Sequence, residues 1–266
     1  GYPNAIQLDN GDITVQGGNF ALKFDRKGLC AWEEDGVAYM QGGFEPNFFR
    51  APTDNDHFID NIWMRYDLHR LENRCENIAF GCDDSGEQVN VRIESVLYPT
   101  GHPAYFRVRQ DYTVHADGTV ALNVAFIPVK KMDLYIARVG LRFRMPERFD
   151  HVTWHGRGPI ESYKDKKTAA FIGVYENTVE GLHEPYIRPQ ENGAHGDCDY
   201  AILESENLRL TVVSTEGFSF NASHYTQEEL TEKRHNFELQ PCGSTVLCLD
   251  YRQNGIGSAS CGVILM

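Results

Sequence analysis

The stretch YFRVRQDYTV at residues 105–114 alternates large apolar side chains with polar or charged ones. The stretches before and after it, VNVRIESV at 89–96 and VALNVAF at 120–126, follow the same period of two. This period puts one row of side chains in a core and the other in solvent, which is typical of antiparallel strands. The turn signal Asp117-Gly118 separates the last two stretches. We therefore expect an antiparallel meander of three long strands.

Shorter segments of the same character continue on both sides of this meander. Strand patterns occur at 13–16, 20–24, 29–32, from 78 onward, and at 135–143, 152–155, 201–203, 208–213, 218–220 and 245–249. Roughly fifteen strands exceed a small sandwich, so we expect an all-β fold of two large, curved, facing antiparallel sheets. The sequence has no repeat, linker or low-complexity tract, so residues 1–266 are expected to form a single domain.

Three regions depart from the strand pattern. Between Ile62 and Leu71 the apolar residues have helix-like spacing, which predicts one short helix. Thr226 precedes a second helical segment, and Glu229 stands at the capping-box position three residues later. The region 156–196 is rich in Gly, Pro and His and shows little periodicity. We expect irregular loops there that carry a function or an interface.

The composition narrows the possible partners and the compartment. The formal net charge of −13 argues against nucleic acid and anionic membranes, and it is compatible with a neutral sugar. The seven cysteines include no CxxC pair, which favours free thiols in a reducing compartment and hence a cytoplasmic location. No apolar run is long enough to cross a membrane, and no signal peptide is visible. Because the first residue is Gly1, we expect a piece of a longer protein.

A turn rich in aromatic and charged residues stands at 46–56 (PNFFRAPTDND). Its two phenylalanines predict an anchor in the core, and its two prolines stiffen the turn that follows. Arg50 can pair with a carboxylate of the group Asp54, Asn55 and Asp56. We interpret these residues as a structural, ion-paired corner, with contact to a ligand as the alternative.

Polar side chains that suit sugar hydroxyls gather between residues 155 and 195. The candidates for a substrate-binding or site-rim role are His155, Arg157, Arg188, Glu191, Asn192 and His195. Arg, Glu and Asn can each engage two neighbouring hydroxyls, and an ion-paired clamp within the loop is the alternative. Gly156 lets another backbone approach closely. His151 and His155 share a strand face, but bonding to backbone at a strand end is a commoner role for such a pair than metal ligation, so we expect no metal site.

Carboxylates alone do not identify a catalytic pair. A retaining glycosidase holds two carboxyl groups about 5–5.5 Å apart. Five acids lie in or near the expected loops: Glu161, Asp165, Glu191, Asp197 and Glu204. The chain has 38 acidic residues, so some are expected in loops by chance. We expect no catalytic pair, and no catalytic residue, in this chain.

Four stretches, in this order, resemble the C-terminal domain or small subunit of family 2 β-galactosidases. They are FRAPTDND at 49–56, WHGRGP at 154–159 with Glu161 and Tyr163, PYIRPQENG at 185–193, and residues 218–235 with Tyr225-Thr226, Glu228-Glu229-Leu230 and His235. No single motif is decisive, but four in sequence are specific, and the match runs from about residue 13 to 262. His235 follows the family pattern and is expected to be structural.

The resemblance implies a β-supersandwich like that of the galactose mutarotases. It also implies that the two catalytic glutamates lie on an upstream (β/α)₈ barrel, so this chain is expected to be inactive alone. The chain would then dock on that barrel through its loops and help to shape the galactoside site in an oligomeric enzyme. No cofactor is expected in this chain, and any Mg²⁺ or Na⁺ that the full enzyme needs would bind elsewhere.

Two features depart from the family pattern, and two other functions remain open. Relatives carry a sugar-contacting tryptophan near the C-terminus, but residues 255–262 contain none, and the chain ends at Met266, where relatives continue through a final strand. One alternative is a free-standing aldose epimerase, with Glu191 and either His155 or His195 as acid and base. The other is a carbohydrate-binding module that uses exposed aromatic residues, for which the candidates are Trp154, Tyr163 and Tyr186.

Overall fold

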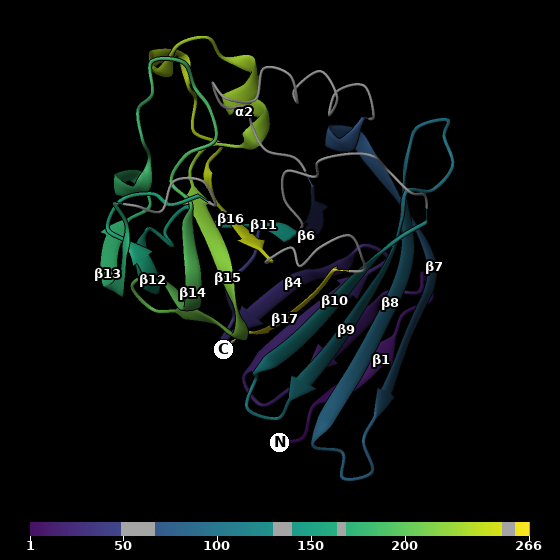
Figure 1. Ribbon diagram of the computed structural model, residues 1–266. Helices are drawn as coiled ribbons and strands as arrows, with labels where there is room; N and C mark the ends of the chain where they lie inside the picture. Colours follow the sequence, from purple (N-terminus) through teal and green to yellow (C-terminus); the bar gives the residue numbers. More distant parts are fainter. Residues whose placement is uncertain (49–66, 130–139, 164–168, 252–258, 266) are drawn as a thin grey trace.

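The computed structural model describes residues 1–48, 67–129, 140–163, 169–251 and 259–265, and these fold into two antiparallel sheets (Figure 1). The smaller sheet has five strands in chain order: β1 (Asn4–Gln7), β2 (Ile13–Gln16), β3 (Phe20–Asp25), β4 (Gly28–Glu34) and β5 (Val37–Ala38). β2 and β3 alternate buried and more exposed residues, as the period of two in the sequence predicts.

The larger sheet has twelve strands and branches at β15. Its main path runs in the order β13-β12-β14-β15-β17-β10-β9-β8-β7, and the branch continues from β15 through β16 and β11 to β6. The bounds are β6 (Gly42–Asn47), β7 (Leu71–Cys82), β8 (Gln88–Pro99), β9 (Phe106–His115), β10 (Val120–Pro128), β11 (Gly140–Pro146), β12 (His151–Gly158), β13 (Phe171–Thr178), β14 (His195–Glu204), β15 (Arg209–Ser223), β16 (Ser244–Asp250) and β17 (Ala259–Leu265). The predicted meander at 89–126 is confirmed as β8, β9 and β10.

The branch arises because the two halves of β15 have different partners. Residues 212–213 pair with β17, whereas residues 219–223 pair with β16. In Figure 1 the small sheet lies against the strands β7–β10 and β17, while β12–β15 form a separate wing on the left. The predicted all-β fold of two antiparallel sheets is confirmed, although the sheets are unequal in size.

One hydrophobic core joins the two sheets. Phe24 of the small sheet meets Tyr112 of β9 edge to face, with 4.8 Å between ring centroids. The Leu29 N–H donates to the Tyr112 hydroxyl at 3.1 Å, so this buried phenol is also hydrogen-bonded. Phe48 stacks on Phe106 at 4.6 Å and is 3% exposed, which confirms the core anchor for Phe48, while Phe49 lies outside the described residues. Residues from both sheets therefore exclude water from a common interior.

The helices are short. The α-helix α2 (Gln227–Glu232) follows Thr226, whose side-chain oxygen accepts from the Glu229 N–H at 3.1 Å, as predicted. The others are 3₁₀ helices: η1 (Leu68–Arg70), η2 (Glu180–Leu182) and η3 (Asn236–Glu238). Of the helix predicted between Ile62 and Leu71, residues 62–66 lie outside the described residues, and Leu71 belongs to β7. No described helix is long and apolar enough to span a bilayer.

The region expected to be irregular contains more strand than predicted. β12 continues to Gly158, and residues 171–178 form β13, an eight-residue strand at one end of the large sheet. The two strands expected at 208–213 and 218–220 are one continuous strand, β15. Residues 259–265, where no strand was expected, form β17 between β10 and β15. The six cysteines whose side chains are described are free, as expected, but only Cys198 and Cys248 of them are buried.

Candidate functional site

The wing formed by β12–β15 carries three of the six candidate residues, His155, Arg157 and His195, and the other three lie in the loop that leads into β14. In β12, residues 152, 154, 156 and 158 are buried and the alternate residues are partly exposed, so the strand has an inner and an outer face. Gly156 lies against β14: a Cβ there would collide with the Cys198 sulfur and stand 3.1 Å from the Gly196 carbonyl oxygen. The close backbone approach expected at Gly156 is therefore present, and it sets β12 tightly against β14.

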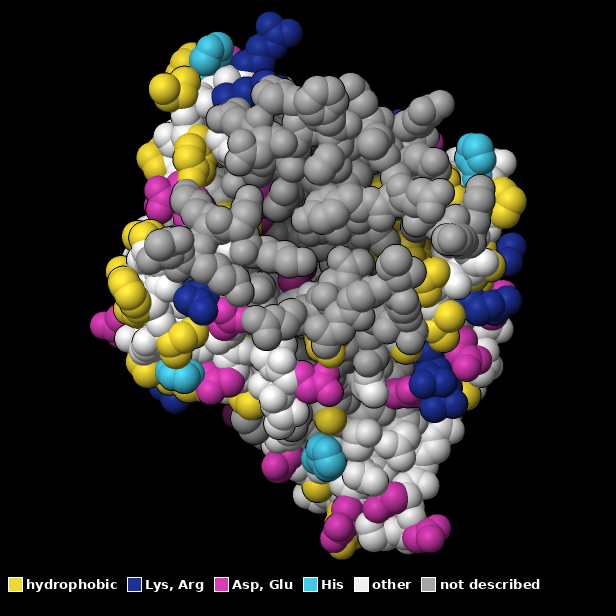
Figure 2. All heavy atoms as spheres, viewed as in Figure 1, with side chains coloured by type: hydrophobic (Ala, Val, Ile, Leu, Met, Phe, Trp, Pro, Cys, Tyr) yellow, Lys and Arg dark blue, Asp and Glu magenta, His cyan; other side chains and the backbone are white. Residues whose placement is uncertain are grey.

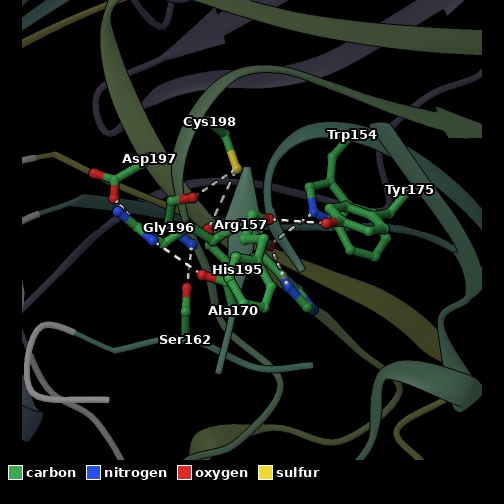
Figure 3. A network of polar contacts seen from close by, with 10 residues as sticks. Trp154, Arg157, Ser162, Ala170, Tyr175, His195, Gly196, Asp197 and Cys198 are labelled. Atoms are coloured by element: carbon green, nitrogen blue, oxygen red, sulfur yellow. Dashed lines mark hydrogen bonds and ion pairs between the residues drawn. The ribbon is translucent and has the colours of Figure 1, made fainter. Parts of the chain in front are cut away.

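On the inner face, the Arg157 carbonyl oxygen accepts two hydrogen bonds (Figure 3). The Trp154 indole Nε1–H donates to it at 3.0 Å, and His195 Nδ1 lies at the same distance. A carbonyl oxygen only accepts, so Nδ1 of His195 carries a proton and, in the neutral ring, Nε2 does not. The His195 ring also packs 4.4 Å from the Trp154 ring and 5.6 Å from Phe220, which locks it between aromatic side chains.

Burial keeps His195 neutral. Its side chain is 1% exposed, and burial lowers the pKa of His195 from 6.5 to about 4. The hydrogen bond to the Arg157 carbonyl and the nearby Glu161 act in the opposite direction without cancelling this effect. A neutral imidazole enclosed in this way can orient the β12–β14 junction, but it has no open path to a ligand.

The loop between η2 and β14 is pinned by side chains that bond backbone groups. Asn192 accepts from the Glu184 N–H at 2.9 Å through Oδ1 and donates to the Gln190 carbonyl at 2.9 Å through Nδ2. Gly193 has φ +74°, and a Cβ there would stand 2.6 Å from the Leu182 carbonyl oxygen, so only glycine fits.

Two buried carboxylates support this loop, one from the segment that follows β12 and one from the loop itself. Glu161, which follows β12, is 6% exposed and accepts from the Gly193 N–H at 2.8 Å and from the Tyr186 hydroxyl. Glu191, in the loop, is 4% exposed. Gly196 N–H donates to Ser162 Oγ at 2.9 Å, which ties the start of β14 to the segment that follows β12. These carboxyl and hydroxyl groups hold the loop in place. The sequence did not indicate this structural role for Ser162.

The outer face of the wing carries two charged pairs. His155 Nδ1 lies 2.6 Å from a carboxylate oxygen of Asp199, and its ring stacks on Tyr200 with 5.9 Å between centroids. The Arg157 guanidinium pairs with Asp197 through Nε and donates to the Ala170 carbonyl at 3.0 Å through Nη1. Side chains of both pairs are partly exposed, so they are available to a partner at this surface.

The structure therefore divides the six candidates into three groups. His195, Asn192 and Glu191 are buried, His155 and Arg157 lie on the outer face, and Arg188 is exposed without a hydrogen bond or ion pair to any described residue. The acid and base considered for an epimerase were Glu191 with either His155 or His195. Glu191 and His195 are both buried, at 4% and 1% exposure, while His155 lies on the outer face, so neither pair is presented together at an open surface. Trp154 is 1% exposed and cannot serve as the open aromatic platform considered for a carbohydrate-binding module.

The residues of the expected structural corner are only partly described. Arg50, Asp54, Asn55 and Asp56 lie outside the described residues. His235 is exposed and begins η3, where its backbone N–H donates to a Glu238 carboxylate oxygen at 3.1 Å. That carboxylate also accepts from neighbouring backbone, and these bonds lower the pKa of Glu238. Among the described residues, no group of three or more His, Cys, Asp or Glu side chains could hold a metal ion.

Comparison with known proteins agrees with this architecture. The chain is similar in fold to a galactose 1-epimerase from Lactobacillus acidophilus NCFM, with a TM-score of 0.54 over 99% of this chain and 97% of that chain and 11% sequence identity. It is 38% identical to a β-galactosidase from Actinobacillus pleuropneumoniae over 97% of this chain and 25% of that protein. It is 34% identical to one from Staphylococcus xylosus over 81% of this chain and 21% of that protein.

The chain thus spans about a quarter of the length of the curated relatives it matches. A family model described as the β-galactosidase small chain matches residues 16–266, which includes every described strand of the large sheet. Because this match covers nearly the whole sequence, the chain belongs to the β-galactosidase small chain family.

Proposed function

We propose that this chain is a non-catalytic part of a larger β-galactosidase and that it packs as one unit against the part that carries the catalytic carboxylates. Two facts support this function: its family, and relatives named β-galactosidase that are about four times as long. Among the described acidic residues of the candidate region, Glu161 and Glu191 are buried, and Glu161 is bonded to the Gly193 N–H and the Tyr186 hydroxyl. The reaction of the assembled enzyme would be hydrolysis of terminal β-galactosides.

The observation that carries the docking proposal is an apolar surface at the edge of the wing. Phe171 is 69% exposed, Ile172 50% and Val174 63%, all within four residues of β13. β13 pairs only with β12 among the described strands, so its other backbone edge is open. Figure 2 shows hydrophobic side chains along the left edge of the molecule, where Figure 1 places β13. Adjacent large apolar side chains on an open strand are typical of an interaction surface.

The charged pairs lie on the same surface. Strand register places Val174 beside His155, and His155 beside Tyr200, while Ile172 stands beside Arg157. The surface therefore has an apolar edge, formed by β13, followed by the pairs His155–Asp199 and Arg157–Asp197. Partly exposed pairs of this kind favour one orientation of a partner more than they strengthen binding.

The relatives' length favours the rest of the enzyme as the occupant over a second copy. About three quarters of each relative lies outside the matched region, so a large partner surface accompanies this chain in those proteins. Two copies of the chain would each bring a formal charge of −13, and this like charge opposes their association. Inter-domain contacts typically bury on the order of 600–1,500 Å², an area that a three-strand face can provide.

The test is to mix this chain with the separately produced remainder of the enzyme and to measure hydrolysis of a chromogenic β-galactoside. Each part alone should have almost no activity, and the mixture should regain it. The double substitution Ile172→Asp, Val174→Asp should weaken the recovery at least about tenfold, since charges would be buried in the interface. Phe80→Asp is the matched control, because Phe80 is 37% exposed on β7 at the other end of the sheet.

Melting curves must show that the variants fold. If the remainder is fully active alone, and the chain alters neither its activity nor its sedimentation, docking is not the function. Hydrolysis by the isolated chain that is lost on substitution of one of its own glutamates would overturn the non-catalytic assignment. Acceleration of galactose mutarotation by the chain, followed by polarimetry, would instead favour the epimerase.

A further inference from the structure

A trough of about 430 Å³ lies away from the wing, where β6, β7, β11 and α2 meet. Figure 1 shows α2 above β6 and β11, with the start of β7 across from them. None of its described lining residues comes from β12, β13 or β14. Its volume falls within the range of roughly 300–1,000 Å³ that is usual for small-molecule sites. Nothing in the proposed docking function uses this part of the molecule.

One wall of the trough contains a polar side chain without a partner among the described residues. Asn73, on β7, has both its Nδ2 and its Oδ1 buried, and neither atom has a hydrogen-bond partner in the part of the chain that the structure describes. A buried donor or acceptor that stays unsatisfied costs about 1–3 kcal/mol, so such groups are uncommon in folded proteins. The amide presents a donor and an acceptor side by side in one plane, and this pair matches two neighbouring hydroxyl groups.

The opposite wall offers the complementary groups. Arg142 bridges two carboxylates: its Nη2 lies 2.9 Å from Glu45, and its Nη1 lies 3.0 Å from Glu228. Burial alone would lower the pKa of Arg142, but these carboxylates raise it, so the guanidinium stays charged. The Glu45 and Glu228 side chains are 57% and 56% exposed. Both Glu228 oxygens accept from Arg142 Nη1, at 3.0 and 3.1 Å, and the remaining exposed lone pairs of the two carboxylates can still accept from a ligand. Gln227 adds an amide beside them.

The lining favours a neutral ligand over an ion. Among the described lining residues, the charged side chains are Lys27, Arg142, Glu45, Glu72 and Glu228, which sum to a formal charge of −1. This charge disfavours an anion, and Arg142 offsets one of the two carboxylate charges that a cation would need. Apolar side chains, among them Leu68 and Leu71, line the same trough and can cover the C–H face of a ring.

We propose that this trough binds a neutral monosaccharide, with Asn73, Arg142 and Glu228 as its polar contacts. A pyranose ring combines vicinal hydroxyls, each a donor and an acceptor, with an apolar C–H face, and the trough offers partners for both. The site is separate from the docking surface on β13, and it does not depend on the proposed function, because binding is measured on this chain without hydrolysis.

The experiment is a titration of the 266-residue chain with galactose, followed by saturation-transfer-difference NMR and by chemical shifts of the backbone amides. Galactose should bind saturably and shift amides near Asn73 and Glu228. Glucose, of the same size and charge, tests whether the site distinguishes hydroxyl configuration, and inorganic phosphate tests for a general anion site. Saturable binding of either hexose, without competition from phosphate, supports the proposal.

Two variants separate a ligand site from a merely unsatisfied amide. Asn73→Leu keeps the side-chain size and removes the orphan polar atoms, so the protein should melt at the same or a higher temperature while sugar affinity falls at least about tenfold. Glu228→Gln, on the exposed side of the trough, should also weaken binding without unfolding. His155→Ala on the wing is the control and should bind normally. No saturable sugar binding, or binding that survives Asn73→Leu, would overturn the proposal.

Discussion

Trp154 and His155 are neighbours in β12, yet they meet opposite surroundings. Trp154 is 1% exposed and is enclosed by the rings of Tyr175, His195 and Phe220. The His155 side chain is 36% exposed, and its partners on the outer face are Asp199, which is 59% exposed, and Tyr200. The inner face therefore stabilises the wing, while the outer face is free to recognise something else. The same contrast recurs in the loop before β14, where Asn192 is buried and Arg188 is exposed.

The largest expected effect comes from breaking the inner face. Trp154→Ala should lower the free energy of unfolding by about 3–5 kcal/mol, as is usual when a large buried aromatic is removed. The Arg157 carbonyl keeps His195 as a donor, so the loss arises mainly from the cavity rather than from an unsatisfied group. His155→Ala is the matched variant one residue away, and it should lower the free energy of unfolding by less than about 1 kcal/mol. Urea denaturation of both proteins measures the difference, and similar losses would contradict the two-face description.

The second prediction concerns pH and the inner face. Burial lowers the pKa of His195 from 6.5 to about 4 in the folded chain, so between these values the unfolded chain binds more protons than the folded one. The contribution of neutral His195 to the free energy of unfolding is therefore fully present above pH 6.5. It is lost as the pH falls toward 4, by about 3 kcal/mol in total.

Unfolding free energies of the native chain and of His195→Gln, measured between pH 4 and 7, test this sign. The variant should be less stable at neutral pH, but it should lose less stability on acidification. His235→Gln, at an exposed position, should keep the native pH dependence. A native chain that becomes more stable as the pH falls through this window would rule out a buried neutral His195.

The sequence predicts those features of the wing that depend on neighbours along the chain. The alternation at 152–155 indicated a strand, Gly156 indicated a close approach, and Thr226 with Glu229 indicated the start of α2. β13 was missed because it is an edge strand: residues 171, 172 and 174 are all exposed and apolar, so the period of two is absent there. An edge position is set by which strands pair, and pairing is not a local property.

The sequence indicated the candidate residues as a group, but it did not show which of them are buried and which are exposed. His195 and Arg157 are 38 positions apart, and only the β12–β14 pairing brings the histidine ring to the Arg157 carbonyl. Composition likewise could not distinguish a buried Asn192 from an exposed Arg188, since both stand in the same loop. The trough has the same character, because Asn73, Arg142 and Glu228 come from three separate elements. Burial depends on tertiary packing, so residue type alone does not separate structural from recognition roles.

The smallest expected effect sharpens the contrast within that loop. Asn192→Ala removes the partner of the Glu184 N–H and of the Gln190 carbonyl, so the free energy of unfolding should fall by about 2 kcal/mol. Asn192→Asp keeps the acceptor for Glu184, but it turns a buried carboxylate oxygen toward the Gln190 carbonyl, so its loss should be at least that of alanine. Arg188→Ala, four positions away and exposed, should stay within about 0.5 kcal/mol of the native chain. Denaturant titration of the three variants gives the order, with amide hydrogen exchange at residue 184 as a local readout.

Arg188→Ala should instead weaken recovery of activity with the remainder of the enzyme, because an exposed arginine beside a docked partner acts through that partner. If Arg188→Ala destabilises the chain as much as Asn192→Ala, the loop is held by its exposed side chains as well, and the separation between structural and docking residues does not hold there.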